Sequence, residues 1–190
     1  MNDLDYLPPF DITPAEGIKL RGFFRGEVWS EPFKSGRRIL LSSWRNNPGL
    51  LIKNSVVDAG INDNENVYFA GSSQRTPWYF GLVDNTGFTS FSSSDTMASH
   101  LGWAEFTNYS ETVRQTWSVG TASAKTITGT ASSAFTMAGS ASIKGSFLTS
   151  NNTKGGTTGQ LWSEGAFGVV QALVTSQVLR VNYTLTGASS

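Results

Sequence analysis

Strict alternation of apolar and polar residues marks three stretches of this chain and limits the folds open to it. Residues 18–29 place apolar side chains or glycine at every second position, with mostly charged residues between them. The same alternation runs from Phe135 to Phe147 and from Leu179 to Thr186. Successive side chains of a strand point to opposite faces, so a period of two predicts half-buried β-strands with a strongly fixed register.

Turn residues divide the chain into further short strands. Residues 31–36 predict a turn and residues 37–44 a returning strand, which together with 18–29 form a hairpin with a basic outer face. The unbroken apolar run Trp78–Val83, within an extended stretch 67–84, predicts a strand covered on both faces. About seven or eight such strands favour an all-β fold with a β-sandwich or jelly-roll-like body.

One or two short helices are also expected. In residues 46–63, apolar residues recur at spacings of three and four, and Gly60 is the predicted stop. Asp95 is the predicted N-cap of a helical turn over 96–100. Charged residues make up only 15% of the chain, and the abundant Ser, Thr, Gly and Asn are poor helix formers, so little further helix is expected.

The first 17 residues differ from the rest. They contain three prolines, which exclude a helix interior or a central strand, yet they are rich in apolar side chains. We expect an extended N-terminal arm over residues 1–17 that lies on its own domain or on a neighbouring subunit, followed by a single β-sandwich domain over 18–190. Tyr6, Leu7 and Phe10 are its candidate contact residues.

Charge is distributed unevenly although the formal net charge is zero. Residues 1–17 carry four acidic and no basic side chains, whereas residues 18–53 carry eight bases and two acids. This basic segment is sparser than a phosphate-binding patch, so we expect it to face acidic protein surface rather than nucleic acid. Four arginines of the hairpin are candidate partner-binding residues: Arg21, Arg25, Arg37 and Arg38.

The sequence offers few residues for chemistry. It has no cysteine, so disulfides and thiolate metal sites are excluded. His100 is the sole histidine; with Glu105 and Glu111 it could form an acid–base set, or the two glutamates a glycosidase pair, but structural pairing, for example with Arg114, is the preferred interpretation. Residues 154–157 resemble a phosphate cradle without its flanking pattern and are interpreted as a loop. We therefore expect no enzymatic activity, cofactor or metal.

Six tryptophans allow two interpretations. Flat indole faces stack on sugars, but scattered large aromatics more commonly fill a core or a subunit interface, which is the interpretation we favour. The six residues are Trp29, Trp44, Trp78, Trp103, Trp117 and Trp162. The first residues lack a signal-peptide pattern, and no apolar run reaches membrane-spanning length, so we expect synthesis and assembly in a cytoplasm without a membrane partner.

Several motifs resemble a family of tailed-bacteriophage virion structural proteins. They cover roughly residues 46–187 and leave the arm outside the resemblance. The motifs are Trp78–Asn85, Asp95–His100, Gly102–Ser110, Arg114 and Trp117 at their spacing, Gly145–Leu148, Ser150–Gly159 and the closing Tyr183–Leu185.

The resemblance implies a component of the phage particle and suggests a cement or decoration protein on the head surface. Its partners would be the major capsid protein and neighbouring copies of itself. The arm would bridge adjacent capsid subunits, and the basic hairpin face would meet acidic capsid surface. A tail or head–tail junction component and a glycan-binding module of the virion remain the alternatives, and an enzyme ranks last.

Overall fold

The computed structural model describes residues 19–188, so the predicted arm over residues 1–17 lies outside the described part. The described residues are mostly β, which confirms the predicted all-β class. In chain order the elements are β1 (Lys19–Trp29), β2 (Leu40–Ser43), the 3-10 helix η1 (Pro48–Leu50), β3 (Leu51–Val56), α1 (Asp58–Phe69), β4 (Trp78–Asp84), β5 (Glu105–Phe106), β6 (Gln115–Trp117), β7 (Thr126–Thr128), β8 (Ser133–Thr136), β9 (Ala141–Thr149), β10 (Leu161–Leu173) and β11 (Val178–Ala188).

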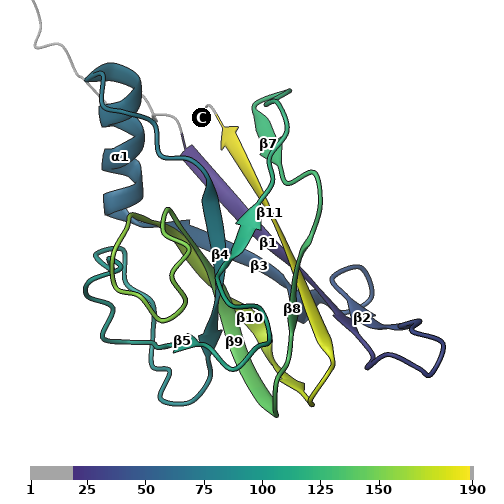
Figure 1. The fold of residues 1–190 in the computed structure, drawn as a ribbon. Coiled ribbons are helices and arrows are strands. Elements are labelled where there is room, and N and C mark those ends of the chain that lie inside the picture. Colours follow the sequence, from purple (N-terminus) through teal and green to yellow (C-terminus); the bar gives the residue numbers. More distant parts are fainter. Residues whose placement is uncertain (1–18, 189–190) are drawn as a thin grey trace, which may run out of the picture.

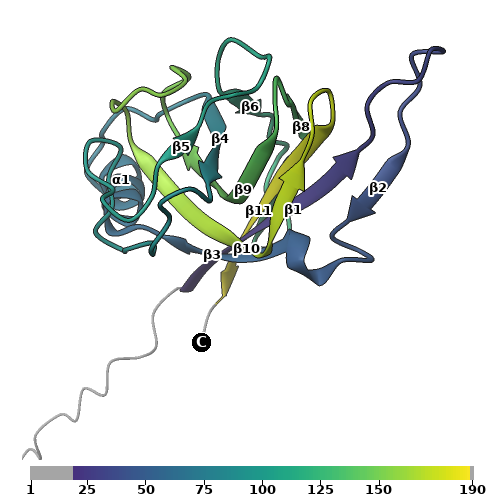
Figure 2. The same cartoon turned by 90° about the horizontal axis from the view of Figure 1, so that it is seen from below.

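Two antiparallel sheets form a sandwich-like body (Figure 1). One contains β7, β11 and β1, with β8 on β11 and β2 on β1; the other runs β5-β4-β9-β10, with β6 on β4. The strand β3 belongs to both, because its first residues pair with β1 and its last two pair with β10. The body is therefore a curved sheet folded over its own core, as the end-on view shows (Figure 2).

Alternation predicted β1 and β11 correctly. From Gly22 to Val28 the even positions of β1 are buried and the odd ones are partly exposed. In β11 the side chains of Leu179, Val181 and Tyr183 are fully buried. Three aromatic rings meet between the sheets. The Phe24 ring centroid lies 6.2 Å from that of Phe80 and 4.7 Å from that of Tyr183. This contact between β1, β4 and β11 marks the centre of the main core.

The stretch 135–147 is buried as predicted, but it is not one strand. Phe135 lies in β8 and pairs with β11, whereas β9 pairs with β4 and β10, so the chain crosses from one sheet to the other near Met137. The register then shifts, because Val83 faces Gly145 while Asp84 faces Ile143. This bulge reverses the alternation, and Phe147 packs in a second cluster on the outer face of its sheet.

The prediction of a helix over 46–63 was wrong in its first half. Residues 51–56 form β3, whose pairing with two strands outweighs the weak local helical spacing. The helix α1 starts only at Asp58 and continues through residues 67–69, which were expected to be extended. Gly60 does not end it; a Cβ there would lie 2.6 Å from the carbonyl oxygen of Trp162, so glycine permits close packing of α1 on β10.

The predicted helical turn at 96–100 is absent from the structure. Thr96 and Ser99 bond to each other across a tight turn instead. Asp95 is therefore no N-cap; its carboxylate accepts from the backbone amide of Ser92 and from Nε1 of Trp103, at 3.1 and 3.0 Å. Within residues 19–188, no helix is long and apolar enough to cross a membrane.

The predicted burial of Trp78–Val83 on both faces is confirmed. Phe80 and Leu82 of β4 belong to the main core, while Val83 belongs to the second cluster on the other face. Residues 85–104 form a loop that covers this outer face, and its Met97 and Trp103 pack with Phe147. The second sheet is thus sealed between a sheet on one side and a loop on the other.

Phe147→Ala should destabilise the protein by about 3–5 kcal/mol, the usual range for emptying a large buried aromatic site. The ring is fully buried and packs against Trp103 at 4.9 Å between centroids. Urea denaturation would measure the free energy of unfolding. Val169→Ala, at a position 59% exposed on β10, is the control and should change it by less than about 0.5 kcal/mol. A loss below about 1 kcal/mol for Phe147→Ala would contradict the observed packing.

Candidate functional site

The connection between β1 and β2 protrudes from the body as a hairpin (Figure 2). Two backbone hydrogen bonds of 2.9 Å fix residues 30–39. At the base the amide of Ser30 donates to the carbonyl of Ile39, and near the turn the amide of Phe33 donates to the carbonyl of Arg37. Gly36 supplies the positive φ of 76° that closes the turn. The predicted hairpin is confirmed, although its second strand is limited to Leu40–Ser43.

This hairpin exposes large apolar side chains. Phe33 and Ile39 are 53% and 52% exposed, and Leu40 and Leu41 are also exposed. We use the name hairpin tip for these four residues together with Arg37, a set that runs from the turn at Phe33 to the first residues of β2. Contiguous exposed apolar surface is characteristic of protein–protein contact sites. Sequence analysis singled out the arginines here but not these side chains. Ile39, Leu40 and Leu41 fall in the predicted strand 37–44, where apolar residues are assigned to the core by default, and Phe33 falls in the predicted turn.

The four arginines named from the sequence have different environments. Arg21 and Arg37 are exposed. Arg38 donates from Nη1 to the carbonyls of Ser30 and Ser176, which ties the base of the hairpin to the β10–β11 turn. Arg25 donates to the hydroxyl of Thr184, and its guanidinium lies 5.1 Å from the Trp44 ring centroid. Tyr6, Leu7 and Phe10 lie outside the described residues, so partner binding through all seven stays a prediction.

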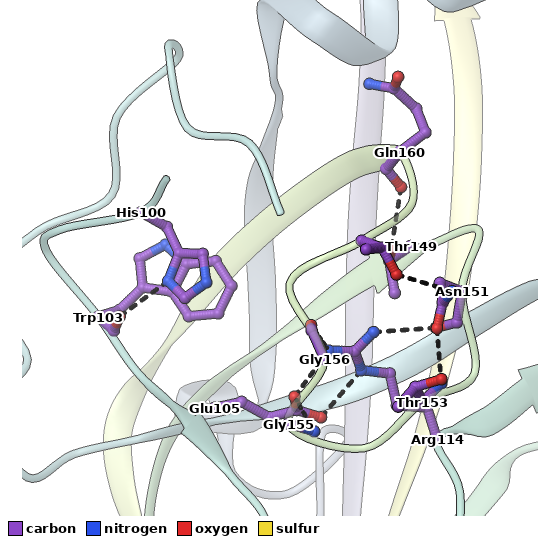
Figure 3. Close-up of polar contacts among 11 residues, drawn as sticks. His100, Trp103, Glu105, Arg114, Thr149, Asn151, Thr153, Gly155, Gly156 and Gln160 are labelled. Atoms are coloured by element: carbon purple, nitrogen blue, oxygen red, sulfur yellow. Dashed lines mark hydrogen bonds and ion pairs between the residues drawn. The ribbon is translucent and has the colours of Figure 1, made fainter. Parts of the chain in front are cut away.

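Arg114 is the centre of a buried polar cluster near the 150–159 loop (Figure 3). Its guanidinium, with no exposed side-chain surface, donates from Nε and Nη2 to the two carboxylate oxygens of Glu105 at 3.0 and 2.7 Å. It also donates to the carbonyls of Asn151 and Gly156, at 2.9 and 2.7 Å. The predicted structural pairing of Glu105 is confirmed, and the bonds from this arginine to Asn151 and Gly156 hold the loop in place.

Glu111 and Lys154 are committed elsewhere in the same region. The carboxylate of Glu111 accepts from the backbone amide of Thr136 instead of pairing with Arg114. The ammonium of Lys154 donates to the carbonyls of Tyr109 and Glu111 at 2.9 and 2.7 Å, and the amide of Gly155 donates to Glu105 at 2.8 Å. Because these donors bond within the protein, the loop interpretation of residues 154–157 holds and a phosphate cradle is not formed.

His100 stacks on Trp103, with ring centroids 3.9 Å apart, and its Nδ1 lies 2.9 Å from the Trp103 carbonyl oxygen (Figure 3). None of its contacts involves Glu105 or Glu111. The structure therefore does not assemble the acid–base set considered from the sequence. Among the described residues, no group of three or more potential metal ligands is found either.

Asp95 and Glu164 form a carboxyl pair that sequence analysis missed. The backbone amide of Ser92 donates to both, at 3.1 and 3.2 Å. Glu164 is 1% exposed, and this burial, together with the neighbouring charge of Asp95, raises its pKa to about 8. At neutral pH Glu164 is thus largely protonated, so its carboxyl can act as a donor to Asp95, and the Ser92 amide that bonds to both acids holds the 85–104 loop against β10.

A shallow polar hollow of about 390 Å³ opens beside Asp95 and is lined largely by serines. Glu164 does not line it. The pair therefore presents one carboxylate, already bonded to Trp103 and Ser92, to the solvent side. No sequence spacing could have joined these two acids, since one lies in an irregular loop and the other in the middle of β10.

The prediction that the tryptophans fill the core is confirmed for three of the six. Trp103, Trp117 and Trp162 are buried. Trp29, Trp44 and Trp78 are half-buried, and two of them are covered by guanidinium groups: Arg180 lies over Trp29, and Arg25 and Arg45 over Trp44, each at 5.1 Å. Trp44 is therefore not an open stacking platform for a sugar.

No protein-family model, curated protein or solved structure matches this chain. The resemblance to phage virion proteins therefore stays a prediction that rests on the motifs alone.

Glu164→Gln should remove a pH dependence of stability. The pKa of Glu164 is about 8 in the folded protein against an ordinary 4.5, so between these values the folded state holds a proton that the unfolded chain releases. The contribution of this group to the free energy of unfolding is complete below its unfolded-state pKa of 4.5, and it is lost as the pH rises through the folded-state pKa of about 8. Urea denaturation between pH 5 and pH 8.5 should show the wild type weakening by up to about 1.4 kcal/mol per pH unit relative to the variant.

At pH 5 the two proteins should have nearly equal stability, because glutamine also donates a hydrogen bond to Asp95. Parallel curves for wild type and variant over the whole range would show that Glu164 does not titrate in this way.

Proposed function

We propose that this protein is a structural component of a bacteriophage particle, and specifically a cement protein that binds the outer surface of the head. The observation that carries the proposal is the hairpin tip, a protruding set of exposed apolar residues beside an exposed arginine. An apolar centre with a charged rim is the usual composition of a protein–protein contact. The phage resemblance names the partner, the major capsid protein.

The anchoring of the hairpin supports an adhesive role. Arg38 and the Ser30–Ile39 bond fix the base of the hairpin on the body. A surface element that is ordered before it binds loses less conformational entropy on contact. The tip can therefore contribute affinity although its apolar area is small.

The internal use of the polar side chains supports the same proposal. Arg114, Glu105 and Lys154 bond to the protein's own carbonyls, amides and carboxylates. Their role is to fix long loops on a rigid body. A protein that reinforces a shell needs such a body and a surface that binds it.

A location on the tail or at the head–tail junction is the second candidate within the particle. Quantitative mass spectrometry of purified virions separates the two. A head cement protein should be present in numbers comparable to the capsid subunits, whereas a junction component should be present as a single ring. The latter stoichiometry would contradict the cement proposal while leaving a role in the particle intact.

Changing the hairpin tip should weaken attachment to heads. The double substitution Phe33→Asp and Ile39→Asp places two charges in the apolar contact, and we expect at least about a tenfold loss of affinity, or 1.4 kcal/mol. Binding to purified heads that lack the protein can be measured by co-sedimentation over a concentration series. Circular dichroism and the urea midpoint should remain those of the wild type, because both side chains are exposed.

Leu101→Asp is the matched control. Leu101 is 99% exposed on the 85–104 loop, so the substitution adds a carboxylate, one against the two of the double variant, at an apolar surface position outside the hairpin. Equal affinity of all three proteins for heads would refute the hairpin as the attachment site.

A further inference from the structure

A small apolar pocket lies between α1 and the edges of both sheets. Its volume is about 270 Å³. Six of its wall residues come from six different strands: Trp78, Trp117, Ile127, Leu148, Trp162 and Leu185. The Trp78 and Trp162 rings meet edge to face at 5.8 Å between centroids. Val67 of α1 forms part of the remaining wall.

The indole nitrogens of the two buried tryptophans are themselves buried. A Cβ at Gly129 would lie 2.8 Å from Nε1 of Trp117, so that nitrogen lies close to the Gly129 backbone. The Trp162 indole lies beside the buried hydroxyl of Tyr183 in the main core. The indoles therefore offer mainly carbon surface to the pocket, which suits an apolar side chain better than a hydroxyl-rich sugar.

Polar groups of the pocket lie on the helix side. Asp63 of α1 and Arg75 form an ion pair with 2.6 Å between Oδ1 and Nε. The arginine side chain remains 48% exposed, so its other nitrogens face solvent. Tyr68 and Phe69, the last residues of α1, are 79% and 81% exposed but do not line the pocket. The site thus combines an aromatic pocket with a cationic rim.

The described chain begins close to this pocket. Lys19, the first residue of β1, pairs with Ala188 of β11. Gly22, three residues later in β1, pairs with the pocket residue Leu185. At about 3.3 Å per residue, the pocket wall is roughly 10 Å from the start of β1. Figure 1 shows the start of β1 at the same end of the molecule as α1 and β7. Residues 1–17 therefore connect to the body beside the pocket.

The composition of residues 1–17 matches the site. The sequence Tyr6-Leu7-Pro8-Pro9-Phe10 supplies apolar side chains next to two prolines, and the segment carries four acids and no base. Aromatic-lined grooves are the common receptors of proline-rich peptides, because such peptides lose little entropy on binding. The acids are complementary to Arg75 and to the basic segment 18–53.

The length of the segment is sufficient for a contact between molecules. From Phe10 to residue 18 there are eight residue steps, and a proline-rich chain that extends by about 3.1 Å per residue would span roughly 25 Å over them. Pro8, Pro9 and Pro14 favour extended backbone, which suits docking on a neighbour.

We propose that the Tyr6–Phe10 segment of one copy docks in the Trp78–Trp117–Trp162 pocket of a second copy. This inference deepens the proposed function, on which it rests, by assigning the arm to a contact between copies and leaving the hairpin tip for the capsid. Exchange of arms would link neighbouring molecules on a head and add to the binding of each.

Sedimentation velocity over a concentration series tests the proposal in solution, without heads. The full chain should self-associate, and a chain lacking residues 1–17 should remain a monomer. A synthetic peptide of residues 1–17 should bind the truncated protein, as followed by tryptophan fluorescence, and should dissociate the full-length complex. Failure of the hairpin to bind heads would leave these results unchanged, so the two proposals fail separately.

Val67→Asp introduces a carboxylate into the part of the pocket wall that α1 contributes, at a half-buried position, and should weaken peptide binding at least tenfold. Val169→Asp, exposed on β10 and outside the pocket, is the matched control and should bind the peptide normally. A monomeric full chain at all concentrations, undiminished self-association after truncation, or equal peptide binding by both variants would overturn the proposal. Binding of a saccharide in place of the peptide would also overturn it.

Discussion

Burial of the second sheet on both faces is the constraint on which the rest of the structure depends. Glycines make room for this packing at two positions of the sheet. A Cβ at Gly81 would lie 2.1 Å from the Phe147 ring, and one at Gly145 would lie 2.1 Å from the carbonyl oxygen of Gly165. These glycines let β4, β9 and β10 support the main core on one face and the Phe147 cluster on the other. The outer cluster in turn requires a cover, which the irregular 85–104 loop provides.

An irregular cover has backbone donors and acceptors that must be satisfied without a ladder. Two buried polar clusters meet this need by different means. The Glu105–Arg114 pair is ionic, and its remaining donors bond to carbonyls of the 150–159 loop. The Asp95–Glu164 pair is not ionic. Burial and the charge of Asp95 keep Glu164 protonated, so the two acids do not repel each other. Both clusters use titratable residues to hold loops on the second sheet, and this explains why acids that suggested chemistry from the sequence serve packing in the structure.

Sequence patterns predicted the elements whose burial follows a local period, and they failed where a distant contact decided the outcome. Alternation identified β1 and β11, and the apolar run identified β4, because each has one environment along its length. Residues 51–56 have ambiguous spacing, and only pairing with two separate strands makes them extended. The 135–147 stretch changes sheet, and a bulge then reverses its alternation, so the burial of its apolar residues was predictable but the strand limits and the face of Phe147 were not.

The same distinction applies to the candidate sites. The arginines and apolar arm were visible as composition, whereas the Asp95–Glu164 pair and the pocket depend on segments that only the fold brings together. The exposure of Ile39 was not predicted, for another reason. It lies in the strand predicted over residues 37–44, and an apolar residue in a predicted strand is assigned to the core unless the strand is known to leave the body.

The strand β1 unites the proposed attachment points. Its first residue follows the arm and its last precedes the hairpin, and a strand of this length spans roughly 30 Å, so the two contacts lie at opposite ends of one rigid element. A molecule built in this way can bind the shell through the hairpin and a neighbour through the arm without strain between the two. Because the second contact forms at high effective concentration once the first is made, neither has to be strong. Small apolar contacts are then sufficient on a crowded head, although each would be weak for a single molecule in dilute solution.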